Sequence, residues 1–270
     1  MKKNDSNSSY EQNQARDVEI TQYDDIAQEY RESKLLPWRD HVEKYTLMQL
    51  AGSIEGQQVI DLACGEGHFT RLLKQKGVAS ILGVDASKAM IELALAEEDR
   101  RPLDIEYCVQ DVCDLKTNGK YDLAFAAWLL NYATDARQLL RMGQAIAGLL
   151  KPGGRFVTIN TNPDDPISNF QMGKPHGFTK HTIVPDQDGC VTPEGTPVVW
   201  KLFLPNGKQI EITNYHLKKT TVTDTLLESG FREVNWHAPQ VSPVAIQTDG
   251  YDHWKPFVDS PPFVFLECHT

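Results

Sequence analysis

The sequence predicts an α/β protein built on a doubly wound, mostly parallel β-sheet. Between residues 59 and 160, short apolar runs typical of buried strands alternate with segments of helical periodicity. Strands separated by helices of this length need right-handed crossovers, which make the strands parallel. The chain has 270 residues, enough for one large α/β domain or one domain with an insertion.

Each element of this sheet has its own signal. Strands are predicted at 59–62, 81–85, 105–109, 121–127, 155–160, 234–237 and 263–267. The helix after the first strand presents Phe69, Leu72 and Leu73 on one face, and Ser87 is the expected N-cap of the next helix. A long helix from residue 136 ends at the Lys-Pro-Gly-Gly sequence of 151–154, and later helices are expected over 223–229 and 251–258.

Two segments fall outside the alternation. Residues 1–17 are polar and charged and are expected to be a disordered tail, followed by a helical segment over 18–50 that is interrupted at Pro37. Residues 161–217 are rich in Pro, Gly and aromatic residues, with a hairpin expected around Asn206-Gly207. We interpret 161–217 as an inserted β-rich cap, so the core comprises 51–160 and 218–270.

Composition excludes several classes of function. The 27 Lys+Arg and 37 Asp+Glu give a net charge of −10, which argues against nucleic acid and anionic membranes as partners. The longest apolar run, 123–130, is too short to span a bilayer, and residues 1–17 lack the apolar centre of a secretory signal. The five cysteines show no C-x-x-C spacing, so we expect reduced thiols, no metal site and a cytoplasmic protein.

The turn after the first strand, Asp61-Leu-Ala-Cys-Gly-Glu-Gly67, is typical of a ligand-binding loop. Its glycines let a ligand approach the main chain, and the helix that follows supplies N–H donors. It is not the dinucleotide pattern G-x-G-x-x-G, because Ala63 or Thr70 occupies one glycine position, depending on the alignment. A tight strand-to-helix turn without a ligand remains the alternative.

Acidic residues follow the next two strands. Asp85 can accept hydrogen bonds from both hydroxyls of a ribose, each contributing about 1.5–3 kcal/mol. The alternative, a helix-capping role for Asp85, is weaker because Ser87 suits that role. Asp111 stands after the third strand, so three features occur in order at three strand ends, where doubly wound sheets bind ligands.

This arrangement resembles the class I S-adenosylmethionine-dependent methyltransferases over about residues 20–160. The resemblance implies a Rossmann-like fold with a seven-stranded sheet, an antiparallel last strand and S-adenosylmethionine as cofactor, leaving S-adenosylhomocysteine. It also implies that Asp111 accepts from the adenine amino group while the N–H of Val112 meets the ring. The implied cofactor-binding residues are Tyr23, Tyr30, Asp61, Ala63, Gly65, Gly67, Asp85, Ala86, Met90, Asp111, Val112, Ala127 and Trp128.

Within that family, residues 23–30, 128–133 and 160–163 resemble the bacterial toxoflavin-type N-methyltransferases and their relatives in secondary metabolism. The resemblance implies that 18–50 is a helical lid in which Tyr23, Tyr30 and Trp38 close over the methionine end of the cofactor. Packing of the same side chains against the core is the alternative interpretation.

The methyl acceptor is less well defined by the sequence. In-line methyl transfer depends on positioning, and a protein base is needed only for a hydroxyl or a protonated amine. His216, at the end of a cap strand, is the first candidate for such a base. The candidates for acceptor binding are Trp128, Tyr132, Phe170, Phe178, His181, Trp200 and Tyr215. Their aromatic character favours a flat or apolar acceptor, although part of the set could simply fill the core of the cap.

We therefore predict a methyltransferase that modifies a nitrogen or oxygen of a small aromatic metabolite, as a monomer or homodimer. An NAD-dependent oxidoreductase is disfavoured by the missing glycine and by Asp111. A DNA methyltransferase is disfavoured because Ser260-Pro-Pro-Phe263 stands before the last strand rather than after the fourth. A non-catalytic nucleoside-binding protein of the same fold is the remaining alternative.

Overall fold

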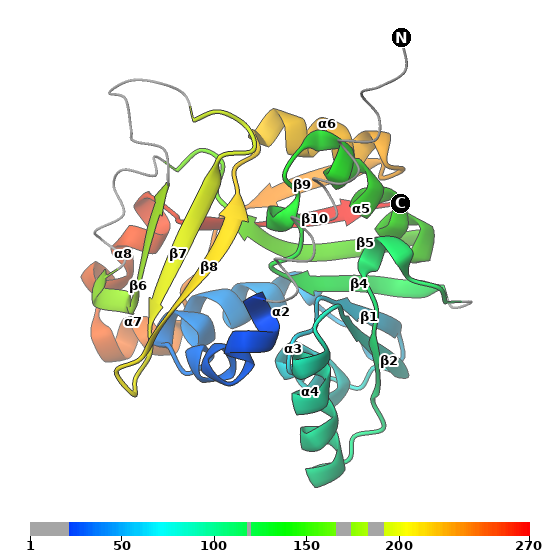
Figure 1. Cartoon of the computed structure of the whole chain (residues 1–270), viewed down its shortest axis with the longest axis horizontal. Helices are drawn as coiled ribbons and strands as arrows, with labels where there is room; N and C mark the ends of the chain where they lie inside the picture. The colour runs from blue at the N-terminus through cyan, green and yellow to red at the C-terminus, as the bar shows by residue number, and fades with distance from the viewer. Residues whose placement is uncertain (1–21, 118–119, 166–173, 183–191) are drawn as a thin grey trace.

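The centre of the molecule is a seven-stranded sheet. The computed structural model describes residues 22–117, 120–165, 174–182 and 192–270 (Figure 1). The strand order is β3-β2-β1-β4-β5-β10-β9, in which β1 to β5 pair in parallel and β10 is antiparallel to both β5 and β9. The strands are β1 Gln58–Leu62, β2 Ser80–Asp85, β3 Glu106–Val109, β4 Tyr121–Ala127, β5 Leu150–Thr161, β9 Glu233–His237 and β10 Phe263–His269. The predicted fold class, including its antiparallel last strand, is confirmed.

Helices cover both faces of this sheet. Helices α3 (His68–Gln75) and α4 (Lys88–Arg100) contribute to one buried cluster, and α5 (Ala136–Leu149) and α6 (Lys219–Glu228) contribute to the other. Neighbouring strand residues alternate between the two, with Val59 in the first cluster and Ile60 in the second. This double winding leaves the carboxyl ends of β1, β2 and β4 free to form a site.

The structure departs from the predicted elements at β5, at α6, which begins at Lys219 rather than at residue 223, and before the helix that begins at Tyr251. Strand β5 begins at Leu150 rather than at residue 155, so the Lys-Pro-Gly-Gly segment lies inside the strand. The pairing changes from Tyr121↔Leu150 to Leu123↔Arg155, and this irregularity absorbs the extra residues. The short helix α7 (Pro243–Asp249) was not predicted; Ser242 caps it by accepting from the N–H of Ala245, and it precedes α8 (Tyr251–Asp259).

The N-terminal segment is helical on both sides of Pro37. Residues 22–33, called here the lid helix, are followed by a turn at 34–36. The chain then forms a π-helix, Arg39–Lys44, which continues into α2 (Tyr45–Ala51). Isolated π-helical turns occur often at functional sites, and this one carries Arg39 and Glu43 into the protein interior.

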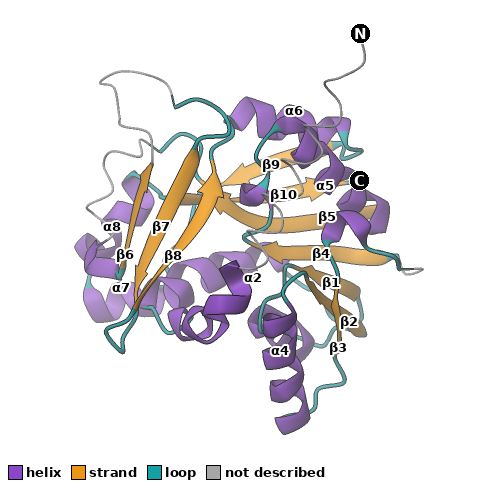
Figure 2. Cartoon of the chain, in the orientation of Figure 1, coloured by secondary structure: helices purple, strands orange, loops and turns teal. Residues whose placement is uncertain are grey.

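The insertion between β5 and α6 contains a second sheet, called here the cap sheet. Its strands β6 (Phe178–Thr182), β7 (Pro197–Phe203) and β8 (Gln209–Tyr215) are antiparallel and stand to one side of the main sheet (Figure 2). The expected turn joins β7 to β8, with Gly207 at a φ of 84°. The predicted tail, 1–17, lies outside the described residues.

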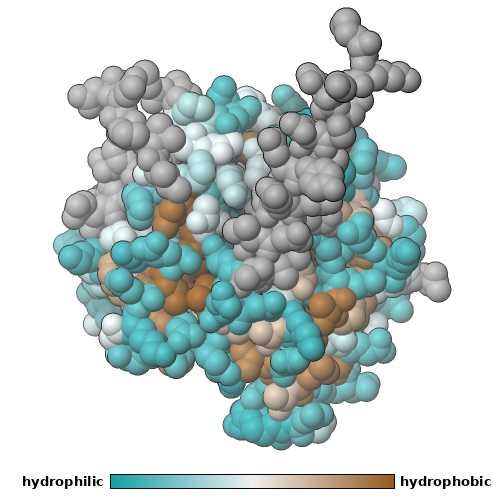
Figure 3. Space-filling model, in the orientation of Figure 1, coloured by the Kyte–Doolittle hydropathy of each residue, from teal (hydrophilic) through white to brown (hydrophobic). Residues whose placement is uncertain are grey.

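On the face drawn in Figure 3, most of the described surface is hydrophilic, with smaller apolar areas. No helix within the described ranges has the length and apolar composition needed to cross a membrane.

Candidate functional site

A cavity lies at the carboxyl ends of β1, β2, β3 and β4, and we call it the first cavity. Its empty volume is about 950 Å³, including its open mouth. It is lined by Tyr23, Tyr30, Ala63, Gly65, Asp85, Ala86, Ser87, Met90, Gln110, Asp111, Val112, Cys113, Ala127, Trp128, Leu129, Tyr132, Gln138, Arg141 and Met142. Every predicted cofactor-binding residue lines this cavity except Asp61 and Gly67.

The loop after β1 brings its main chain to the cavity wall. Ala63 and Gly65 have φ values of 52° and 56°, in the left-handed region. A Cβ atom at Gly65 would point between Met90 and Tyr30, at 4.0 Å from each. Because all three residues line the cavity, a side chain at Gly65 would occupy space that the glycine leaves open.

Asp85, at the end of β2, is held by two main-chain donors. One oxygen accepts from the N–H of Ser87 at 2.8 Å and the other from the N–H of Gly65 at 2.7 Å. Each carboxylate oxygen can accept a further hydrogen bond. Burial raises the pKa of Asp85 to about 6, an effect that the two N–H donors oppose and that the carboxylate of Asp24 reinforces. Asp85 is therefore mainly ionised at neutral pH.

Ser87 and Asp111 both cap helices beside the cavity. The hydroxyl of Ser87 accepts from the N–H of Met90 at 3.2 Å, which confirms Ser87 as the N-cap of α4. One oxygen of Asp111 accepts from the N–H of Cys113 at 2.7 Å, at the start of the short 3₁₀ helix Val112–Asp114. This cap fixes the orientation of the Asp111 carboxylate on the cavity wall.

Asp61 and Gly67, the two ends of the 61–67 loop, do not line the first cavity. Asp61 is buried and accepts from the hydroxyl of Thr70 at 2.6 Å, which fastens the end of β1 to α3. Burial raises the pKa of Asp61 to about 7. Gly67 has a φ of 79°, and a Cβ atom there would collide with the hydroxyl of Tyr107. Both residues therefore support the conformation of the loop without lining the cavity.

The lid helix closes one side of the first cavity. The hydroxyls of Tyr23 and Tyr132 are hydrogen-bonded to each other, and the ring of Tyr23 meets the ring of Tyr30 edge-on at 5.2 Å between centroids. Burial, together with Tyr132, raises the pKa of Tyr23 well above its usual value, so its hydroxyl stays protonated. Sequence reasoning missed Asp24, whose carboxylate joins this helix to Ser87 at 2.6 Å.

A second, narrower cavity adjoins the first, with an empty volume of about 300 Å³ including its open mouth. It is lined by Tyr23, Tyr30, Trp38, Arg39, Trp128, Tyr132, Trp200, Leu202, Ile212 and Asn214. Four of these residues, Tyr23, Tyr30, Trp128 and Tyr132, also line the first cavity. The two cavities are therefore adjacent and share a boundary formed by these four aromatic residues.

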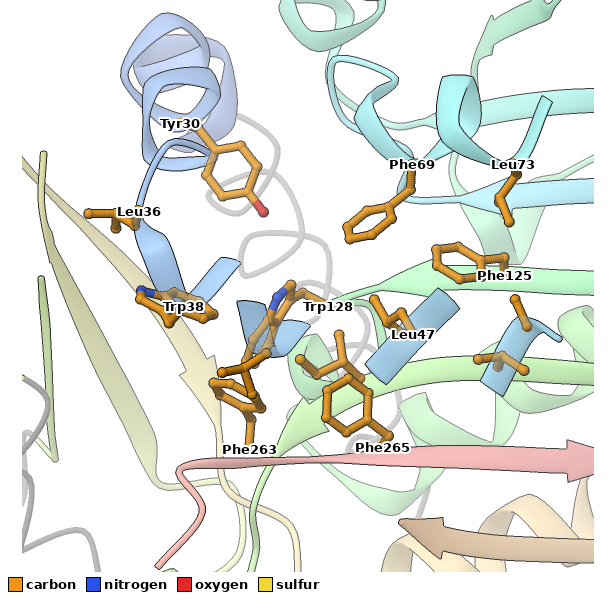
Figure 4. Close-up of a cluster of buried hydrophobic side chains, with 14 of the residues drawn as sticks. Tyr30, Leu36, Trp38, Leu47, Phe69, Leu73, Phe125, Trp128, Phe263 and Phe265 are labelled. Carbon is orange, nitrogen blue, oxygen red and sulfur yellow. The ribbon is translucent and has the colours of Figure 1, made fainter. Parts of the chain in front are cut away.

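Trp128 is held at this boundary by a buried ionic network. It directly follows β4 with a φ of 69°, which is unusual for a non-glycine residue and typical of residues held in place at functional sites. Its indole N–H donates to Glu43, which pairs with Arg39 at 2.9 Å. Although burial opposes it, the charge of Arg39 holds the pKa of Glu43 below its usual value. Figure 4 shows Trp128 close to Phe263, with a centroid distance of 5.6 Å.

The structure brings three of the predicted acceptor-binding residues, Trp128, Tyr132 and Trp200, to the second cavity. Phe178 lies beside it, stacked on Trp200 at 5.5 Å. Phe170 lies outside the described residues.

Three other candidates line neither cavity. His181 is exposed and Tyr215 is half-buried, because each is offset by one residue from a buried neighbour, Lys180 or Asn214, and side chains alternate across a strand. His216 is buried just beyond the end of β8, where its main-chain N–H donates a hydrogen bond to the carbonyl oxygen of Thr196. The structure thus does not bring the candidate base to the meeting point of the cavities.

Sequence reasoning missed several residues that line the second cavity. They are Arg39, Leu202, Ile212 and Asn214. The alternation of Ile210, Ile212 and Asn214 on one face of β8 was the available signal. Among the described parts of the chain, there is no group of three or more His, Cys, Asp or Glu side chains that could hold a metal ion.

Comparison with known proteins identifies residues 59–154 as matching the family model of the methyltransferase domain. The ubiquinone biosynthesis O-methyltransferase of Bordetella avium is 32% identical over 121 residues, covering 43% of this chain and 48% of that protein. The enzyme of the same name from Acinetobacter baylyi is 30% identical over 142 residues, covering 47% and 58%. The chain thus spans about half the length of the curated relatives it matches.

Solved structures extend the likeness beyond that segment. The CcbJ methyltransferase from Streptomyces caelestis aligns with a TM-score of 0.60 at 18% identity, covering 92% of this chain and 95% of that one. An S-adenosylmethionine-dependent methyltransferase from Mesorhizobium loti aligns with a TM-score of 0.59 at 20% identity, covering 84% and 97%. At these identities the likeness shows the fold.

Proposed function

We propose that this chain transfers a methyl group to a small planar acceptor. Its residues 59–154 match the methyltransferase domain, and its fold is that of the class I S-adenosylmethionine-dependent methyltransferases. The observation that carries the proposal is the boundary between the cavities at Tyr23, Tyr30, Trp128 and Tyr132. A cofactor in the first cavity and an acceptor in the second would meet there.

The first cavity suits S-adenosylmethionine in the placement of its polar groups. The open space at Gly65 suits a ligand that lies against the main chain, and the Asp85 carboxylate can accept from ribose hydroxyls. Asp111 and the N–H of Val112 are the candidates for contact with the adenine ring. Tyr23 and Tyr30, on the lid helix, are the candidates for the methionine end.

The bound cofactor would supply an electrophilic methyl group on a sulfonium sulfur. The residues of this chain would then act by binding and alignment, which can provide a large part of the acceleration of such a displacement. The buried Arg39–Glu43 pair fixes Trp128, and the Tyr23–Tyr132 hydrogen bond joins the lid helix to the segment after β4. Aromatic walls exclude water from the space between the two ligands.

The second cavity favours an acceptor atom that needs no protein base. No Asp, Glu or His is among the described residues that line it. Arg39 is balanced by Glu43, and Tyr23 keeps its proton. These observations support transfer to an unprotonated nitrogen, such as that of a heteroaromatic ring, over transfer to a neutral hydroxyl. Transfer to oxygen, as the names of the curated relatives state for those proteins, is the second candidate.

Four further expectations stay predictions. The toxoflavin-type relationship and a role in secondary metabolism rest on the sequence resemblance. The cytoplasmic location rests on the cysteine pattern; the described cysteines, Cys64, Cys108, Cys113 and Cys268, are free. Whether the chain is a monomer or a homodimer is also a prediction.

Calorimetric titration with S-adenosylhomocysteine, with NADH as the competing ligand, tests the cofactor. We expect binding of the former alone, and no binding at millimolar concentration would contradict the proposal. Ile212→Trp, which would fill the second cavity, should leave S-adenosylhomocysteine binding unchanged and abolish methyl transfer in a screen of planar acceptors. Full transfer activity in this variant would exclude the second cavity as the acceptor site.

A further inference from the structure

We propose that Asn214 selects the acceptor in the second cavity, by donating a hydrogen bond to an oxygen or an unprotonated ring nitrogen of a planar ligand. The inference rests on the proposed function, because it treats the second cavity as the acceptor site. It goes further by naming the polar feature that the acceptor must carry.

Asn214 lies on the buried face of β8, where the preceding residues of the strand are apolar. Ile210, Ile212 and Asn214 alternate along the inner face of the cap sheet, and all three are buried. Asn214 is 3% exposed and is paired in register with Val198 of β7, which is also buried. A polar amide therefore replaces the aliphatic side chain that this face of the strand favours.

The side-chain nitrogen of Asn214 has no hydrogen-bond partner among the described residues. A buried donor without a partner loses its bonds to water and gains none in return, which makes it destabilising. Buried polar groups in native proteins are generally hydrogen-bonded, so an exception needs an explanation. Because Asn214 lines the second cavity, a ligand in that cavity can supply the missing acceptor.

The other polar groups of the cavity point to the same ligand chemistry. The indole N–H of Trp38, which also lines the cavity and is 1% exposed, is a second donor without a partner in the described chain. Arg39 donates from Nη1 to Glu43 at 2.9 Å and from Nη2 to the hydroxyl of Ser33 at 3.4 Å, while its Nε is a further buried donor without a partner in the described chain. The cavity thus offers unused donors between aromatic faces. It suits a flat, uncharged molecule that presents hydrogen-bond acceptors.

Isoquinoline and naphthalene are suitable probes, because they have the same shape and differ by one unprotonated ring nitrogen at pH 8. Their binding would be measured by ligand-observed NMR with and without S-adenosylhomocysteine. A buried polar group discriminates strongly against an analogue that leaves it unpaired. We expect the wild-type protein to prefer isoquinoline by about tenfold, which corresponds to one hydrogen bond.

Asn214→Leu should abolish this preference and leave S-adenosylhomocysteine binding unchanged. It should also raise the Tm, by about 2–4 °C, because it removes an unpaired buried donor. A purely structural role of Asn214 predicts the opposite change in Tm. The matched control is Asn131→Leu: Asn131 is 2% exposed, its side-chain oxygen and nitrogen lack partners within the described residues, and it lines neither cavity.

The control variant should keep the tenfold preference for isoquinoline. Equal binding of the two probes to the wild-type protein, a preference that survives Asn214→Leu, or a lower Tm of that variant would each overturn the inference. Failure of S-adenosylhomocysteine to bind is a separate result that contradicts the proposed function. The probe preference measured without it would still decide the role of Asn214.

Discussion

The carboxylate of Asp24 accepts a hydrogen bond from the hydroxyl of Ser87 at 2.6 Å, and so ties the lid helix to the first turn of α4. The same oxygen of Asp24 accepts from the N–H of Ala89 at 3.1 Å. Ser87 in turn caps α4 and donates its own N–H to Asp85. The lid helix is thus positioned by the residues that hold the candidate ribose-binding carboxylate.

Asp24→Ala should weaken S-adenosylhomocysteine binding by about 2- to 10-fold, because hydrogen bonds of an exposed carboxylate contribute about 0.5–1.5 kcal/mol. The Kd would be measured by calorimetry. Asp25→Ala is the matched control, since Asp25 is also exposed and makes no contact with α4 that parallels those of Asp24. Equal effects of the two substitutions would show that the contact with Ser87 does not position the lid helix.

Binding of S-adenosylhomocysteine should weaken as the pH falls through about 6. The pKa of Asp85 is raised to about 6 by burial, and only the ionised carboxylate can accept from two ribose hydroxyls without a competing proton. Below this pH the Kd should rise by up to about tenfold per pH unit, as expected for uptake of one proton. Titrations between pH 5 and pH 8 would measure this slope.

Two variants show which carboxyl group is responsible. Asp85→Asn should bind more weakly and lose the pH dependence near 6. Asp61→Asn should retain it, because Asp61 does not line the first cavity and has a pKa of about 7. If the pH dependence disappears in Asp61→Asn and persists in Asp85→Asn, the titrating group is Asp61. That result would contradict the proposed role of Asp85.

Asp61→Asn should also stabilise the protein at alkaline pH. Burial raises the folded-state pKa of Asp61 to about 7, above its ordinary value, and one of its oxygens has no partner in the described chain. The stability that Asp61 contributes is therefore fully present below its unfolded-state pKa, about 3.9, and is lost as the pH rises through about 7. The gain in Tm of the variant should be larger at pH 8 than at pH 5.

Asp122→Asn is the control of opposite sign. Lys151, at 2.8 Å, lowers the pKa of Asp122, so its contribution to stability is present at pH 8 and is lost in acid. The loss of Tm at pH 8 should be small, because both side chains are about one-third exposed. If the Tm rises at pH 8 in both Asp61→Asn and Asp122→Asn, the stabilisation comes from the change in net charge alone.

The sequence was informative where function depends on local structure. Asp85 at the end of β2, Asp111 shortly after β3 and the loop after β1 lie where a strand ends, and strand ends follow from local apolar runs. The second cavity is different, because it depends on the register between elements that are distant in the chain. The sequence pointed to Tyr215 and His216, whereas Asn214 faces the cavity. A displacement of one residue along a strand reverses the face on which a side chain lies.

The Arg39–Glu43 pair shows a second limit of sequence reasoning. Its burial depends on a π-helical turn that no residue pattern in the sequence predicted. Arg39→Met alone should destabilise the protein by about 3–5 kcal/mol, because it leaves the buried Glu43 carboxylate uncompensated. The double variant Arg39→Met/Glu43→Gln should cost less, since Gln still offers an oxygen to the Trp128 indole and carries no charge.

Urea unfolding of the single and double variants would give the coupling energy of this pair. The exposed pair Lys88–Glu92, at 3.6 Å, is the control and should show a coupling below about 1 kcal/mol. Additive effects of Arg39→Met and Glu43→Gln would mean that the two buried charges are stabilised independently, and that Glu43 is not held at Trp128 by Arg39.

Gly67 and Gly83 both make room for Tyr107, at different atoms of its side chain. A Cβ atom at Gly67 would collide with the hydroxyl of Tyr107, whereas a Cβ at Gly83 would lie 2.6 Å from Cδ1 and 2.7 Å from Cε1 of the ring. Gly67→Ala should therefore destabilise the protein, through this collision and through the positive φ of 79°, which alone costs about 1–2 kcal/mol.

Tyr107→Phe should rescue part of the loss in Gly67→Ala, because it removes the colliding oxygen and leaves the nearest ring atom at 3.0 Å. It should not rescue Gly83→Ala, because the ring carbons remain in place. Thermal unfolding of the two glycine variants, each with and without Tyr107→Phe, would measure the difference. Rescue of both variants, or of neither, would contradict this packing of Tyr107 and would place the requirement at Gly67 in backbone conformation or ligand contact instead.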